Sequence, residues 1–248
     1  MGSPTLTVNQ DVLFFETGFT GQLVDNQDVL IFELPAPAMS IYPLTPPVIS
    51  GIGPKTQTIG SDNLVAKTES PFTFSQQLQQ WPGQKLTMQA SMPPMPRVQG
   101  EQWVSWLLAL MGEWGTTLFG DYLCATPQGP MSGTPVVNGS NASGLNVLNL
   151  RGCTASVVNW AFAGDYLQVT AGIGQPQRLY KILQNASSNS SGDVTLEIYP
   201  NIREALTDGT AIVTTNTQGT FRLTKNSQSW KIDENKIYTI SFQLEEAI

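Results

Sequence analysis

Hydrophobic and polar residues alternate with period two along much of the carboxyl-terminal half of the chain. The clearest run is 238–245, where Tyr, Ile, Phe and Leu alternate with Thr, Ser, Gln and Glu. Runs at 163–169, 178–183, 193–200 and 220–223 are similar, and loops rich in Asn, Ser and Gly separate them. Period two is typical of strands with one buried face and one face in water. The pattern predicts a mainly β protein of sandwich or barrel type, in which Leu167 and Val169 lie on the opposite face from Tyr166 and Gln168.

One segment has helical rather than strand periodicity, and it predicts an amphipathic helix at about 98–114. Its large apolar residues recur at helical spacing and fall on one face: Trp103, Trp106, Leu107, Leu110, Met111 and Trp114. Three tryptophans in a stripe could form a platform for sugars or bases, but a buried face packed on a sheet is the favoured interpretation. Gly112 and Gly115 suit the end of the helix.

The amino-terminal region contains a near-repeat, NQDVLFFE at 9–16 and NQDVLIFE at 26–33. Each copy has the length of a strand, and the glycine-containing segment between them predicts a hairpin or two paired edge strands. The alternative is an extended arm that pairs with a neighbouring subunit, because exposed strand edges invite pairing. The proline-rich stretch from Leu34 to Pro54 is expected to be extended and irregular.

Composition excludes several classes of function. The chain has 248 residues, no histidine, and 19 acidic against 12 basic residues, a net charge of −7. Without histidine, most hydrolase and metal sites are disfavoured, and an acidic surface disfavours specific binding of nucleic acid. Cys124 and Cys153 lack metal-site spacing and are expected to be free thiols. No secretory signal or membrane-spanning run is recognised, so synthesis in a cytoplasm is expected.

Paired carboxylates would be the remaining catalytic resource, and a cell-wall hydrolase that uses carboxylates alone is one hypothesis. Most candidates lie in turn-like contexts, where they cap the backbone: Glu16, Glu33, Asp62, Glu69, Glu101, Asp121, Asp165, Asp193 and Asp208. No dinucleotide loop, phosphate loop, calcium loop or zinc motif is recognised. The prediction is therefore a protein that is not an enzyme and has no catalytic, cofactor-binding or metal-binding residues. The arginines stand apart in the sequence, so no polyanion-binding stripe is expected either.

Domain organisation follows from a segment dense in Gly, Pro, Ser and Asn between Ala125 and Asn149. It predicts a long loop or the passage into a second domain. The favoured division puts 1–125 and 216–248 in an amino-terminal β-domain that carries the helix and forms the assembly, and inserts a smaller β-domain at 126–215. A tandem arrangement with its boundary near residue 150 is the alternative.

Four stretches, 70–84, 92–121, 163–183 and 193–247, resemble bacteriophage minor tail proteins of the distal-tail or baseplate-adaptor type. The resemblance begins at about residue 65, and its motifs are structural rather than catalytic. It implies a virion protein, assembled in the host bacterial cytoplasm, that forms a ring at the end of the tail tube. The implied partners are other copies of the chain, with a hexamer as the favoured ring, together with tail-tube and hub or baseplate proteins. DNA would pass through the lumen without specific binding, and no membrane is involved.

A carbohydrate-binding module that recognises the host surface is the alternative function. It would use exposed aromatic side chains that stack on sugar rings: Trp81, Trp160, Tyr166, Tyr199 and Trp230.

Overall fold

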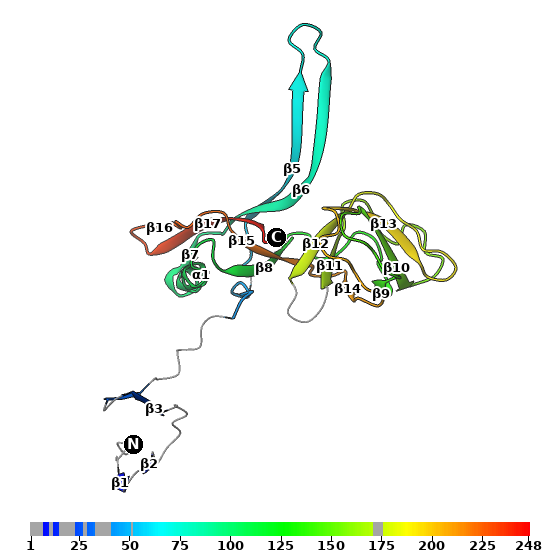
Figure 1. Cartoon of the computed structure of the whole chain (residues 1–248). Helices are drawn as coiled ribbons and strands as arrows, with labels where there is room; N and C mark the ends of the chain where they lie inside the picture. The colour runs from blue at the N-terminus through cyan, green and yellow to red at the C-terminus, as the bar shows by residue number, and fades with distance from the viewer. Residues whose placement is uncertain are drawn as a thin grey trace. The chain divides into compact units, whose positions relative to one another are not determined.

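The computed structural model describes residues 7–9, 12–14, 23–26, 29–32, 41–50, 52–170 and 176–248. In these residues the chain is mainly β with one α-helix, as the alternation predicts (Figure 1). The chain divides into two compact units, Met1–Ile41 and Tyr42–Ile248. No helix in the described part is long and apolar enough to cross a membrane.

The first unit contains two short antiparallel hairpins, each made of neighbouring strands: β1 (Thr7–Asn9) with β2 (Val12–Phe14), and β3 (Leu23–Asn26) with β4 (Val29–Phe32). The prediction that the two NQDVL copies form one hairpin with each other is wrong. Each copy instead spans a strand end and the next strand start, with Asn9 opposite Val12 and Asn26 opposite Val29. The first residue of each copy, Asn9 or Asn26, is therefore the last residue of the first strand of its hairpin.

The second unit holds a seven-stranded antiparallel sheet in the order β5-β6-β17-β15-β8, with β7 and β16 also paired to β17. Its strands are β5 (Thr56–Glu69), β6 (Gln76–Ser91), β7 (Met95–Pro96), β8 (Thr116–Gly120), β15 (Gln218–Leu223), β16 (Trp230–Ile232) and β17 (Ile237–Glu246). Strand β17 confirms the alternation predicted at 238–245, because Tyr238, Ile240, Phe242 and Leu244 are buried and the residues between them are exposed or half-buried. Glu246, which follows this run, is buried. It lies in the middle of the sheet, paired with β6 on one side and β15 on the other.

Helix α1 (Arg97–Ala109) covers the apolar face of this sheet. Trp103 and Trp106 pack against Phe242 of β17, with ring centroids 6.0 and 5.2 Å apart, respectively. The helix ends earlier than predicted, and Met111 and Trp114 are 54% and 76% exposed rather than buried. Met111 has a φ of 50° and the following glycine a φ of 69°, so the backbone turns left-handed before a further helical turn can form.

The second sheet has six strands in the order β14-β11-β12-β13-β10-β9 and nearly closes into a barrel. They are β9 (Gly133–Val137), β10 (Val147–Cys153), β11 (Tyr166–Thr170), β12 (Gln177–Ile182), β13 (Val194–Tyr199) and β14 (Ile212–Val213). A bridge between Val136 and Ala211 and a bond from Val137 N to Thr210 O join its two ends. Strand β9 and the start of β10 lie inside the segment that sequence alone predicts as a loop.

After β8 the chain leaves the first sheet and forms β9–β14 in the second sheet. It then returns to the first sheet as β15–β17. This order fits an inserted second part, while the domain boundaries themselves stay a prediction. The two sheets meet at β11 and β12. In β11, Tyr166 and Gln168 are buried as well as Leu167 and Val169. The predicted wet face of β11 is therefore wrong: Tyr166 packs in the core of the first sheet, and Gln168 accepts a bond from Gln218 N at 2.8 Å.

Candidate interaction surface

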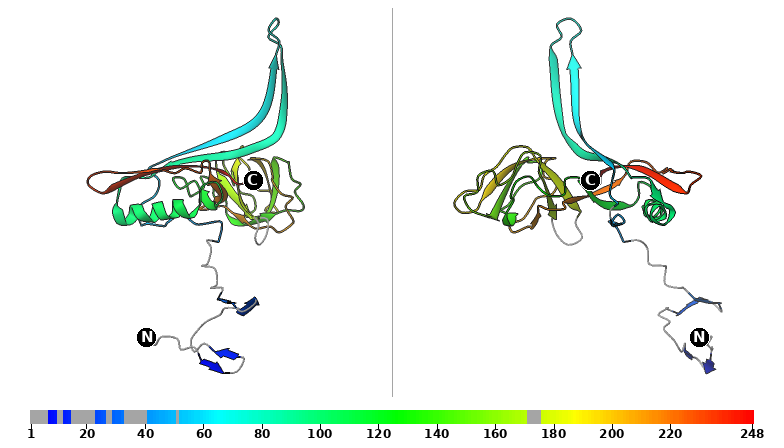
Figure 2. Two further views of the ribbon diagram at one scale, coloured as in Figure 1. Left: turned by 60° about the vertical axis from the view of Figure 1, so that its left-hand side comes forward. Right: turned by 180° about the vertical axis from the view of Figure 1, so that it is seen from behind.

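The two longest strands form a hairpin that extends beyond the sheet. Strand β17 pairs with β6 only from Thr87 to Ser91, and beyond that point β5 and β6 pair with each other alone. All residues from 61 to 83 are exposed except Ser70, which is half-buried. We call residues 61–83 the projecting hairpin; Figure 2 shows it leaving the sheet. Both of its faces are in solvent, and among the described residues its edges are too, except at Asp62, whose carbonyl oxygen accepts from the Tyr199 hydroxyl at 3.1 Å.

An irregularity in the ladder marks the point where the projecting hairpin leaves the body. Asn63 lies opposite Gln84 and Val65 opposite Gln80, so Leu64 faces three residues of β6, which include Pro82. Proline lacks a backbone donor and is tolerated in a strand at such bulges. Bulges bend a strand and increase its twist, and the ribbon curves here in Figure 2.

The tip of the projecting hairpin presents two aromatic rings to solvent. Phe72 is 92% exposed and Phe74 is 73% exposed. The turn is held by bonds from Ser70 N to Ser75 O and from Phe74 N to Ser70 O, each 2.9 Å long. Phe74 has a φ of 55°, a conformation that is rare for a bulky residue and that persists at sites fixed by their surroundings.

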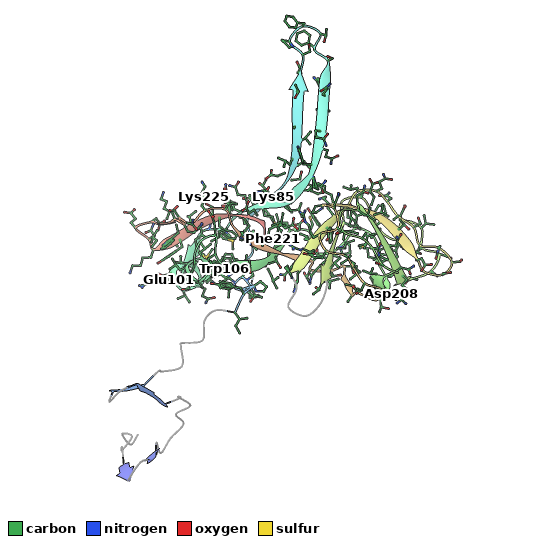
Figure 3. The ribbon with its side chains drawn as sticks, viewed as in Figure 1. Lys85, Glu101, Trp106, Asp208, Phe221 and Lys225 are labelled. Carbon is green, nitrogen blue, oxygen red and sulfur yellow. The ribbon has the colours of Figure 1, made fainter. Side chains whose placement is uncertain are left out.

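The root of the projecting hairpin is tied to β17 by charged groups. The Lys85 ammonium, labelled in Figure 3, donates to Glu245 at 2.7 Å and lies 3.8 Å from Asp62. The hydrogen bond to Glu245 raises the pKa of Lys85, against the opposing effect of desolvation. On either side of this lysine, Gln84 O accepts from Arg203, and Leu86 N donates to Glu246 at 3.3 Å.

Behind this root lies a buried ion cluster that joins the two sheets. Glu246 accepts from Arg203 Nη2 at 2.7 Å and lies 3.9 Å from Arg178 Nη1, and these three side chains are 4–10% exposed. Arg178 also donates to Glu204 at 2.5 Å and to Ala247 O at 2.5 Å. The sequence separates the arginines and gives no sign of this cluster, which long-range contacts alone create.

Each candidate catalytic carboxylate in the described residues has its own hydrogen-bond or ion-pair partner within the protein. Asp165 accepts from three backbone amides, those of Gln128, Gly129 and Phe162, and Asp121 accepts from two. Two carboxylates face lysines: Glu69 pairs with Lys67, and Asp62 lies near Lys85. Glu101 accepts a hydrogen bond from the Tyr238 hydroxyl. Asp193 accepts from Asn189, and Asp208 accepts from Arg151. The Gly139 amide and then Arg151 lower the pKa of Asp208. Glu16 and Glu33 lie outside the described residues.

No cluster of three or more His, Cys, Asp or Glu that could hold a metal ion is found in the described residues. The two cysteines are free thiols, as predicted. Cys124 is exposed, whereas Cys153 is buried, and desolvation together with the charge of Asp193 raises its pKa to about 11. Such a thiol carries little thiolate near neutral pH and is a poor nucleophile.

The five aromatic residues considered for sugar stacking are mostly covered. Trp160 is fully buried in the barrel, where its indole donates to Ser132 O at 2.8 Å, so its expected exposure is wrong. Tyr166 is 7% exposed, and Tyr199 and Trp230 are half-buried. Trp81, at 52%, is the most exposed of the set and lies on the projecting hairpin.

In comparisons with known proteins, no family model and no curated protein matches the chain. The candidate surface therefore depends on its own geometry: an exposed two-stranded ribbon with an aromatic tip and a charged root.

Proposed function

We propose that the chain is a structural protein of a bacteriophage tail whose copies assemble into a closed ring at the distal end of the tail tube. In this role the ring joins the tube to hub or receptor-binding components. The projecting hairpin is the observation that carries the proposal of assembly. The tail is the setting implied by the sequence resemblance.

A two-stranded ribbon alone in water is marginally stable, and unpaired edges favour association with other chains. The projecting hairpin also exposes large apolar side chains along its length and at its tip: Leu64, Val65, Phe72, Phe74, Leu78 and Trp81. A standard protein interface uses about 20–30 residues on each side. The projecting hairpin supplies a segment of that size, so a protein partner suits it better than a small ligand.

The charge of the projecting hairpin suits contact between copies of an acidic chain. From residue 64 to the end of the segment its charged residues are Lys67 and Glu69, which pair at 2.8 Å. Two chains that each carry −7 can approach through this neutral ribbon without concentrating like charges. The acidic balance of the chain also suits a ring through which DNA slides, because anionic walls do not hold phosphate.

The carbohydrate-binding alternative is less well supported, because Trp160 and Tyr166 are buried. A sugar-stacking role for the exposed Trp81 would involve the same projecting hairpin and would not account for its length.

Light scattering combined with electron micrographs of the same fraction tests the proposal. We expect a closed ring with a mass that is a multiple of 26.9 kDa. Replacing residues 64–83 by a short Asn-Gly turn should give monomers whose circular dichroism retains the β signal. A full-length protein that stays monomeric at high concentration, with and without tail-tube protein, would overturn the proposal.

A further inference from the structure

We propose that the hollow at the root of the projecting hairpin binds the aromatic tip of the projecting hairpin of a second copy. This inference rests on the proposed function, because it names the contact through which copies would join. It commits to an uncharged aromatic side chain as the ligand and to another molecule of the same chain as its source.

The hollow has a volume of about 250 Å³ and lies beside the bulge of the ribbon. It is lined by Asp62, Asn63, Leu64, Gly83, Gln84, Lys85 and Ile248. Leu64 and Ile248 are 60% and 69% exposed, so both present apolar surface that nothing in the described residues covers. For comparison, an apolar protein cavity of about 150 Å³ holds benzene. The hollow therefore has room for a phenyl ring.

Three of the four polar side chains around the hollow, those of Asp62, Gln84 and Lys85, are already engaged, which favours an apolar ligand. Asp62 and Lys85 face each other at 3.8 Å, and Lys85 is further bound to Glu245. Gln84 is 8% exposed, and its side-chain Oε1 accepts from Asn201 N at 2.8 Å. A charged ligand would find the two charged side chains of the hollow already facing each other, and it would lose hydration.

The tip has the properties that the hollow requires. Phe72 and Phe74 lie in the segment SPFTFS, which carries no charge, and both rings are exposed. The tip cannot fold back into its own root, because ladder pairs from Val65–Gln80 to Glu69–Gln76 keep the ribbon extended between them. A tip that fills a hollow must therefore enter the hollow of another copy.

Each copy then offers one tip and one hollow, which are different surfaces. Contacts of this kind are heterologous, and they produce a ring when the rotation between copies closes. The same property gives a sharp test, because a copy that lacks one surface can still use the other.

Two variants separate the surfaces. The tip variant carries Phe72→Ser and Phe74→Ser, and the hollow variant carries Leu64→Asp, which places a carboxylate on an apolar wall. Each variant alone should associate at least tenfold more weakly than the unchanged chain, because burying one Phe side chain corresponds to about a decade or more in an equilibrium constant. Mixed, they should form a one-to-one complex, in which the tip of the hollow variant enters the hollow of the tip variant. Leu145→Asp, at a side chain that is 51% exposed and lies outside both the projecting hairpin and the hollow, is the matched control and should assemble normally.

Light scattering of each sample, with melting temperatures to show that all variants remain folded, gives distinguishable outcomes. If the unchanged chain forms rings and both variants do so equally well, the tip-to-hollow contact is wrong while the proposed ring stands. If both variants are monomers and their mixture forms no heterodimer, the tips do not enter the hollows, and the inference falls as well. If the unchanged chain stays monomeric at high concentration both with and without tail-tube protein, this inference and the proposed function fail together.

Discussion

Replacing Glu246 by alanine is expected to destabilise the junction between the two sheets more than any change on the surface of the same strand. Glu246 is the shared acceptor of the buried ion cluster: Arg203 Nη2 donates at 2.7 Å, and Leu86 N donates at 3.3 Å. Arg178 Nη1 lies 3.9 Å away. The alanine variant leaves these donors in place and removes their acceptor.

The magnitude follows from which groups lose a partner. Arg178 keeps Glu204, whereas Arg203, with its side chain 10% exposed, keeps only the carbonyl of Gln84. Removing one partner from a buried ion pair typically costs about 3–5 kcal/mol, because the remaining charge is neither hydrated nor paired. For a chain of this size each kcal/mol corresponds to about 2–4 °C in Tm, so the melting temperature should fall by roughly 6–20 °C.

Urea unfolding and calorimetry of the variant measure this loss, and Glu245→Ala is the matched control. Glu245 is the preceding residue of β17, it points to the opposite face, and its bond to Lys85 is partly exposed. Exposed pairs contribute about 1 kcal/mol or less. Equal stability of the two variants, or a Glu246→Ala protein as stable as the unchanged chain, would refute the assignment of a structural role to the buried cluster.

Two further predictions concern stability. Gly100→Ala should lower the free energy of unfolding in urea by about 1–3 kcal/mol, although alanine favours helices, because its Cβ would overlap the Tyr238 ring. Ser105→Ala on the exposed face of the helix should leave that free energy unchanged, and a stabilised Gly100→Ala protein would contradict the packing. Burial raises the pKa of Tyr180 to about 12, so the unfolded chain loses this proton near pH 10 while the folded chain keeps it. The contribution of Tyr180 to stability should be intact below pH 10 and fall by roughly 2–3 kcal/mol as the pH rises to 12. Tyr180→Phe should therefore make the loss of stability above pH 10 shallower in unfolding curves, and parallel curves for the two proteins would contradict this assignment.

The elements that the sequence predicts well are those whose signal is local. Strand β17 alternates strictly, and alternation alone decides which side chains face the core. The helix is equally visible, but its end is not, because Met111 and Trp114 continue the 3.6-residue spacing after the backbone has turned left-handed. The local sequence feature that marks this end is Gly112, which has a φ of 69° in the structure.

The candidate surface was less predictable, for two reasons. The cluster of Arg178, Arg203 and Glu246 depends on long-range contacts and on the packing of two sheets, which no local pattern encodes. Arg203 and Glu246 are 43 positions apart, and Arg178 is further still from Glu246. The projecting hairpin lacks alternation because neither of its faces is buried by the same chain. Its apolar residues Leu64, Val65 and Trp81 therefore give no period, and the proline at 82 is the main local indication of a bulge.

The buried cluster and the projecting hairpin are parts of one arrangement. Three successive residues at the root, Gln84, Lys85 and Leu86, are each bound to a charged side chain. Charge-assisted hydrogen bonds are directional, so they fix the angle of the root more sharply than apolar contact, which tolerates sliding. A root fixed in this way carries the tip in a defined direction, and less conformational freedom is lost when the tip docks. Burying Glu246 and two arginines costs desolvation free energy. A fixed direction of the ribbon offsets that cost here, since the proposed assembly depends on where the ribbon places its tip.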